Sequence, residues 1–107
     1  DTLLTRLQKA APHARIEVGN IPDLALLPSL QNEDATALHQ QIETYNTAIN
    51  SIVQNHQVIL VDLVNALQNA QGLISGDGFH PNEAGYLQVA QFFYNALEKA
   101  EKTRAVA

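Results

Sequence analysis

Asp77 and His80 are the residues best placed to do chemistry, because they lie three positions apart in a glycine-rich loop. In a turn, this spacing can bring the carboxylate to one ring nitrogen of the imidazole and fix its tautomer and orientation. The other ring nitrogen is then free to act as a general base toward a hydroxyl nucleophile. Gly76 and Gly78 permit the tight backbone, and Pro81 stiffens the start of the following helix. The pattern predicts the acid–base half of a hydrolase active site.

Two other interpretations fit the same spacing. Asp-x-x-His also arises by chance, so on the spacing alone a structural turn with a surface histidine is the stronger interpretation. The pair could also ligate a metal, but two ligands without a third at suitable spacing make a thin case. The chain has no cysteine, which excludes disulfides and thiolate zinc sites.

The composition predicts one small folded domain. Hydrophobic residues make up 46% of the 107 residues and charged residues 16%, which argues against a disordered acidic tail. Six residues are Lys or Arg and the net charge is −5, so we expect no nucleic-acid partner. No apolar run approaches the roughly 20 residues that cross a bilayer, so we expect no membrane-spanning segment. Because the sequence has no methionine, we expect it to have been cut from something longer.

The N-terminal third predicts a helix, a strand and an apolar loop. Residues 2–11 predict a helix that ends at Pro12, with one packing face formed by Leu3, Leu4 and Leu7. Residues 14–18 alternate apolar and polar side chains, as in a short strand. The loop over 21–28 has two prolines and three leucines, Leu24, Leu26 and Leu27. These leucines either line a substrate pocket at the end of the strand or pack beneath neighbouring helices.

The middle of the chain predicts a long helix and a buried strand. Residues 36–55 repeat apolar side chains at spacings of four and three, at Leu38, Ile42, Tyr45, Ile49 and Ile52. His39 and His56 lie on or near this helix with no acidic residue at a telling spacing, so we interpret both as surface histidines. Residues 58–61 are continuously apolar, which is typical of a parallel strand covered on both faces.

Asp62 closes this strand and has two candidate roles. A carboxylate at the carboxyl end of a strand can be catalytic, but it more often caps the next turn, here a short helical segment over 63–70. The last helix is predicted from Pro81 or Asn82 to about Lys102, with a buried stripe formed by Leu87, Ala90, Phe93, Tyr94 and Leu97. Strands joined by helices predict parallel pairing in a layered α/β fold, and two strands alone predict an incomplete sheet.

The segment Asp77–Tyr86 closely resembles the last conserved block of the SGNH, or GDSL, hydrolase family. That block reads Asp-x-x-His-Pro, then two or three residues, then glycine and an aromatic or histidine residue at the opening of the final helix. Val18–Pro22 resembles the strand and loop after the family's Gly-x-Asn-Asp block, and Val61–Leu63 looks like the end of its last strand. The resemblance covers roughly residues 15–97.

This resemblance implies a flavodoxin-like three-layer αβα sandwich with a parallel sheet, of which residues 1–107 supply the C-terminal portion of a single domain. It implies a serine esterase or lipase that acts through an acyl-enzyme on a small-molecule or lipid ester, with no metal or organic cofactor. By position, Asp77 is the orienting acid and His80 the general base. The candidate substrate-binding residues are Leu24, Leu26, Leu27 and Phe79. Many relatives are secreted, and a processed N-terminus would agree with that location, but a sequence trimmed from a longer protein would begin in the same way, which leaves the compartment open.

The sequence departs from this family where the nucleophile belongs. It has no Gly-Asp-Ser block, and its only serines are Ser29, Ser51 and Ser75. Ser75 is near Asp77 but lacks the strand-to-helix setting that exposes a nucleophile. The family's oxyanion donors are also absent, so we expect this chain to be inactive without a missing N-terminal half. The alternative is a non-catalytic α/β half-domain that associates with itself or a partner through an open sheet edge.

Overall fold

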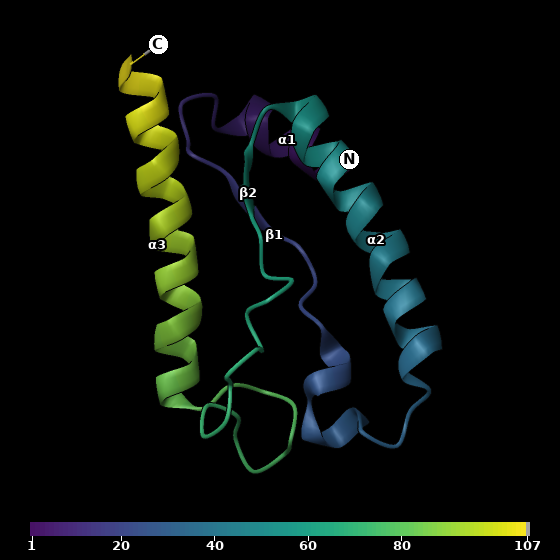
Figure 1. The fold of residues 1–107 in the computed structure, drawn as a ribbon. Coiled ribbons are helices and arrows are strands. Elements are labelled where there is room, and N and C mark those ends of the chain that lie inside the picture. Colours follow the sequence, from purple (N-terminus) through teal and green to yellow (C-terminus); the bar gives the residue numbers. More distant parts are fainter. Residues whose placement is uncertain (107) are drawn as a thin grey trace.

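The computed structural model describes residues 1–106, which form a mixed α/β arrangement of helices around two short strands (Figure 1). In chain order the elements are α1 (Thr2–Ala10), β1 (Glu17–Gly19), α2 (Ala35–His56), β2 (Ile59–Val61) and α3 (Glu83–Val106). Two single turns of 3₁₀ helix, η1 (Leu24–Leu26) and η2 (Pro28–Leu30), interrupt the loop between β1 and α2. The predicted order of strands and long helices is thereby confirmed.

The two strands pair in parallel, with Glu17 opposite Ile59 and Gly19 opposite Val61. α3 contacts both strands, and α2 contacts β2. Figure 1 places α3 on one side of the strands and α2 on the other, with α1 near the end where both strands begin. Because the strands are parallel, their carboxyl ends lead to the same side of the molecule, where the loops 20–34 and 62–82 lie.

Side-chain caps fix where the two long helices begin. The Asp34 carboxylate accepts hydrogen bonds from the N–H groups of Thr36 and Ala37 at 3.0 and 3.2 Å, and a cap of this kind contributes about 1 kcal/mol. At the start of α3, the side-chain oxygen of Asn82 accepts from the N–H of Gly85 at 2.9 Å. Both helices therefore begin within a residue or two of the predicted positions.

Residues 63–70 form successive turns in place of the predicted short helix. One turn is closed by a hydrogen bond from the N–H of Ala66 to the carbonyl of Leu63. Asn69 has a φ of 65°, a left-handed conformation that interrupts a right-handed helix. Asparagine favours such turn conformations over helix interiors, and this competition explains why the helix does not form.

The buried face of α3 differs from the predicted stripe. Leu87 and Tyr94 are 74% and 60% exposed, whereas Gly85 is buried and Val89 is half-buried. Gly85 packs directly against the carbonyl of Leu73, an approach that any larger side chain would block. This close contact turns the Gly85 side of the helix inward and leaves the larger leucine and tyrosine outside.

The predicted packing faces of α1 and α2 are also only partly correct. In α1, Leu4 is buried but Leu3 and Leu7 are exposed. In α2, Tyr45 is exposed although the periodicity places it in the stripe, and Asn46 is buried although it is polar. Asn46 is drawn inward because its amide binds backbone groups of the loop after β1.

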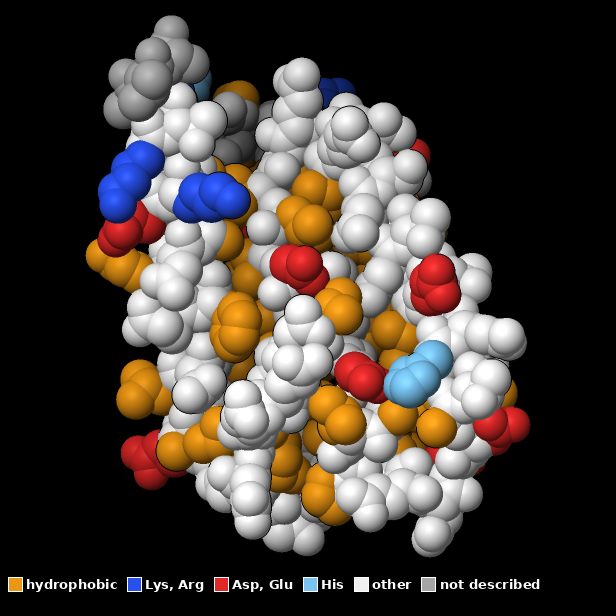
Figure 2. Space-filling view, viewed as in Figure 1, with side chains coloured by type: hydrophobic (Ala, Val, Ile, Leu, Met, Phe, Trp, Pro, Cys, Tyr) orange, Lys and Arg blue, Asp and Glu red, His pale blue; other side chains and the backbone are white. Residues whose placement is uncertain are grey.

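The hydrophobic core of the molecule is small. Its buried members are Leu4, Leu27, Ile42, Val53 and Val61, of which only Val61 is fully buried among the described residues. Other apolar side chains gather on the face between α3 and α2, over the strands and the loops that follow them (Figure 2). Within residues 1–106, no helix combines the length and the apolar character needed to span a membrane.

Candidate active site

The loop that carries Asp77 and His80 is closed by backbone hydrogen bonds. The N–H of Ser75 donates to the carbonyl of His80 at 2.8 Å, and the N–H of Gly78 donates to the carbonyl of Ser75 at 3.0 Å. Gly78 has a φ of 71°, which glycine adopts without strain. Its carbonyl accepts from the N–H of Ser29 at 3.0 Å, which ties the loop to η2. The backbone therefore fixes the acid and the histidine relative to each other.

Asp77 is held through both of its carboxylate oxygens. Oδ2 lies 2.6 Å from Nδ1 of His80. Oδ1 accepts from the N–H groups of Phe79 and His80 and from the hydroxyl of Ser75, each at 2.9 Å. The hydrogen bond to the His80 ring, followed by the two backbone N–H groups and Ser75, lowers the pKa of Asp77 well below its usual range. The carboxylate therefore stays ionised opposite the imidazole.

The contact with Asp77 leaves the second ring nitrogen of His80 available. An ionised carboxylate at Nδ1 requires a proton on that nitrogen, so the lone pair of the neutral ring lies on Nε2. The His80 side chain is 64% exposed, and among the described residues Nε2 makes no hydrogen bond. The Phe79 ring packs edge-on against the imidazole, with centroids 5.1 Å apart. This arrangement can take up a proton at Nε2 while the ring is held in one tautomer.

Ser75 belongs to the acid side of the pair. Its hydroxyl donates to Oδ1 of Asp77 and also lies 2.9 Å from the carbonyl oxygen of His80. The hydroxyl is thus engaged in positioning the carboxylate, a role that the sequence analysis did not assign. Of the other two serines, Ser51 lies within α2 and Ser29 within η2.

Asp62 caps the turn after β2, as predicted. Its Oδ1 accepts from the N–H of Val64 and from the side-chain amide of Asn20, both at 3.1 Å. Asn20 is buried, and its side-chain oxygen accepts from the N–H of Leu63 at 2.6 Å. These bonds join the carboxyl ends of β1 and β2, where the loops of the candidate site begin.

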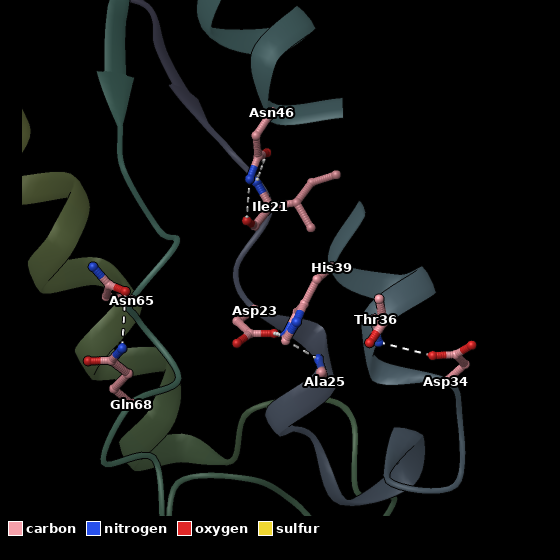
Figure 3. A network of polar contacts seen from close by, with 9 residues as sticks. All are labelled: Ile21, Asp23, Ala25, Asp34, Thr36, His39, Asn46, Asn65 and Gln68. Atoms are coloured by element: carbon pink, nitrogen blue, oxygen red, sulfur yellow. Dashed lines mark hydrogen bonds and ion pairs between the residues drawn. The ribbon is translucent and has the colours of Figure 1, made fainter. Parts of the chain in front are cut away.

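A second acid–histidine pair joins the loop after β1 to α2. Nε2 of His39 lies 2.9 Å from Oδ1 of Asp23, which also accepts from the N–H of Ala25 at 3.2 Å (Figure 3). Further along α2, the amide of Asn46 binds both the N–H and the carbonyl of Ile21 at 2.8 Å. The expectation that His39 has no acidic partner is wrong, because that partner lies 16 positions away in the sequence.

His56 is also engaged by other residues and is not a free surface histidine. Its Nδ1 lies 3.0 Å from the side-chain oxygen of Gln8, and its Nε2 contacts the carboxylate of Asp1. The side chain is only 14% exposed. The prediction of a surface histidine is therefore wrong here, because both partners come from the distant N-terminal segment. His56 ties that segment to the end of α2.

An apolar cavity of about 210 Å³ lies beside the loop that carries the acid–base pair. Its walls include Leu24 and Leu27 from the loop after β1 and Phe79 from the acid–base loop itself. Leu26, the remaining candidate substrate-binding residue, is exposed and lies outside these walls. The fold thus brings three of the four candidates to one cavity.

Comparison with known proteins gives one family. A sequence model of the GDSL-like lipase/acylhydrolase family matches residues 1–88, a range that runs from α1 through the acid–base loop into α3. No curated protein and no solved structure matches the chain. Among residues 1–106, no group of three or more histidine, aspartate or glutamate side chains could hold a metal ion.

Proposed function

Because this chain belongs to the GDSL-like lipase/acylhydrolase family, we propose that it supplies the acid–base half of a serine hydrolase acting on small-molecule or lipid esters. Membership of the family supports a hydrolase of the esterase type. In the proposal, Asp77 is the orienting acid and His80 the general base. The observation that carries it is the 2.6 Å contact between Asp77 Oδ2 and His80 Nδ1, beside an exposed Nε2.

The proposed reaction has two halves, and both use Nε2 of His80. Nε2 removes the proton of a serine hydroxyl as its oxygen attacks the ester carbonyl carbon. The imidazolium, stabilised by Asp77, then gives this proton to the oxygen of the departing alcohol, which leaves the serine acylated. In the second half, Nε2 takes a proton from water as the water oxygen attacks the acyl carbon, and the proton passes to the serine oxygen as the acid leaves. Asp77 stays ionised throughout, in line with its lowered pKa.

The serine and the oxyanion donors would come from a segment that completes the sheet. Residues 1–107 would then be the C-terminal part of a single domain with a flavodoxin-like three-layer architecture. The parallel pairing of the two strands and the helices on either side of them support this proposal. This chain alone is expected to hydrolyse esters at the background rate, because its sequence has no Gly-Asp-Ser block.

The test is ester turnover by the protein that unites this chain with a Gly-Asp-Ser segment, with a p-nitrophenyl ester as substrate. His80→Ala is expected to lower kcat by at least about 10³-fold, because the general base is lost. His39→Ala is the matched control, since it removes the other exposed imidazole that is paired with an acid, and its kcat should be unchanged. Unchanged turnover in His80→Ala contradicts the proposal.

The second candidate is a non-catalytic half-domain that associates with itself or with a partner through its sheet edge. It is favoured by the two-stranded sheet, which in the described part of the chain leaves one edge of each strand unpaired. Sedimentation equilibrium over a concentration series separates the two candidates. A mass that rises with concentration supports association, and a monomer at the highest concentration contradicts it.

A further inference from the structure

The cavity beside the acid–base loop is lined almost entirely by hydrocarbon. Gln88 is the one lining residue with a polar side chain. The apolar walls come from the loop after β1, from the turns that follow β2, and from the first turns of α3, where Val89 contributes. Water in a buried site needs two to four polar partners, and this cavity offers few of them. Its chemistry therefore suits a hydrocarbon ligand.

The cavity lies next to His80, although His80 itself is not one of its lining residues. Phe79 and Pro81 both line it, and His80 lies between them in the sequence. The Phe79 ring also packs edge-on against the imidazole, at a centroid distance of 5.1 Å and an interplanar angle of 73°. One aromatic ring thus forms both a wall of the cavity and a contact surface of the imidazole.

We propose that this cavity binds the acyl chain of the ester substrate, up to a length of about six to eight carbons. The inference rests on the proposed function. An apolar protein cavity of about 150 Å³ holds benzene, which has six carbons, and pockets for drug-sized ligands begin near 300 Å³. The volume of about 210 Å³ lies between these two sizes. A short or medium acyl chain therefore fits, and the end of a long one would be left outside.

The acyl part of the ester, and not the alcohol part, belongs in the cavity. Nε2 of His80 delivers a proton to the alcohol oxygen, and His80 does not line the cavity, so the alcohol part of the ester lies outside it. The acyl group stays bound during the second half of the reaction. A chain anchored against Phe79 keeps its carbonyl beside the imidazole while water attacks.

The test is an NMR titration of the 107-residue chain with the methyl esters of butanoic, hexanoic, octanoic and dodecanoic acids. Methyl resonances of Leu67, Ile74 and Val89, which line the cavity, are expected to shift saturably. The dissociation constant should fall about fourfold for each added methylene, until the chain reaches about eight carbons and the trend levels off. An absence of saturable shifts at these methyls overturns the inference, and so does an affinity that keeps rising to the dodecanoate ester.

A pair of variants tests where the chain binds. Ala66→Leu adds three carbons to the cavity wall and is expected to shorten the preferred chain by about that number. Ala90→Leu makes the same change on the exposed side of α3, outside the cavity, and should leave the preference unchanged. Equal preferences in the two variants overturn the inference, and the wild-type series decides it if Ala66→Leu does not fold.

Failure of this inference can be told apart from failure of the proposed function. The binding series involves no turnover, so it reports on the cavity alone. Retained activity in His80→Ala contradicts the proposed function, whatever the result of the ester-binding series. Loss of the chain-length limit contradicts the acyl site, even where His80→Ala is inactive.

Discussion

The two exposed acid–histidine pairs differ in which ring nitrogen the acid holds. Asp77 contacts Nδ1 of His80 at 2.6 Å, whereas Asp23 contacts Nε2 of His39 at 2.9 Å. Nε2 is the ring nitrogen farther from the backbone, so the first pair leaves the outer nitrogen free and the second leaves the inner one. A histidine can act as a base only through a nitrogen that the substrate can reach. The same two residue types therefore favour catalysis in one region and structural support in the other.

The surroundings of the two pairs also favour catalysis at Asp77–His80 and structural support at Asp23–His39. Oδ1 of Asp77 accepts three further hydrogen bonds, while Asp23 shares one oxygen between His39 and the N–H of Ala25. The first pair lies beside the apolar cavity, and the second lies in a groove whose lining includes polar side chains of α2 such as Glu43 and Asn50. We therefore interpret the Asp23–His39 pair as a structural contact that holds the loop after β1 against α2.

Replacing each acid by its amide should separate the two pairs most strongly. In the complete enzyme, Asp77→Asn is expected to lower kcat by about 10⁴-fold, because the amide neither fixes the Nδ1–H tautomer nor stabilises the imidazolium. Asp23→Asn is expected to leave kcat unchanged, because its histidine does not present Nε2 to the substrate. Steady-state kinetics on both variants checks this, and equal losses would remove the distinction between the pairs.

The structural role of the second region can be tested at Asn46. Asn46→Ala leaves the N–H and the carbonyl of Ile21 without their partner, which should lower the free energy of unfolding by about 2 kcal/mol. Asn50→Ala, one turn further along α2 and exposed, is the matched control and should change it by less than about 0.5 kcal/mol. Urea denaturation measures both. If the free energy of unfolding falls no further in Asn46→Ala than in the control, the Asn46 amide does not stabilise the loop after β1.

The smallest expected effect is a dependence of stability on pH. The folded-state pKa of Asp77 lies below the usual value of about 3.9, so the unfolded chain binds more protons over that range. The stabilisation from this carboxylate is therefore complete above the unfolded pKa and is lost as pH falls toward the folded one. Urea denaturation between pH 2 and 5 should show that the wild type has a larger free energy of unfolding than Asp77→Asn, and that this difference shrinks as the pH falls. A difference in the free energy of unfolding between wild type and Asp77→Asn that does not change with pH would contradict the explanation that native hydrogen bonds lower the pKa of Asp77.

Features encoded by neighbouring residues could be predicted from the sequence. The Asp77–His80 pair could be predicted because both residues lie in one short loop, and α2 could be predicted because apolar side chains repeat along it at spacings of four and three. β2 is visible as a continuous apolar run. In each case the residues that give the signal lie close together in the sequence, so the local pattern contains it.

Features created by distant contacts could not be predicted. The partner of His39 lies 16 positions away, and Asn46 is buried because of backbone groups 25 positions away. The buried face of α3 follows from a close approach between Gly85 and Leu73, whereas periodicity favours the side that carries Leu87. Sequence periodicity finds apolar faces, but only the tertiary contacts decide which of them is covered.

The most direct test of the central claim is the tautomer of each histidine ring, measured by long-range ¹H–¹⁵N NMR on the 107-residue chain at a pH where the rings are neutral. The account predicts that His80 carries its proton on Nδ1, with a bare Nε2, and that His39 carries its proton on Nε2. A proton on Nε2 of His80 would contradict the account, because the nitrogen proposed as the general base could then no longer accept one.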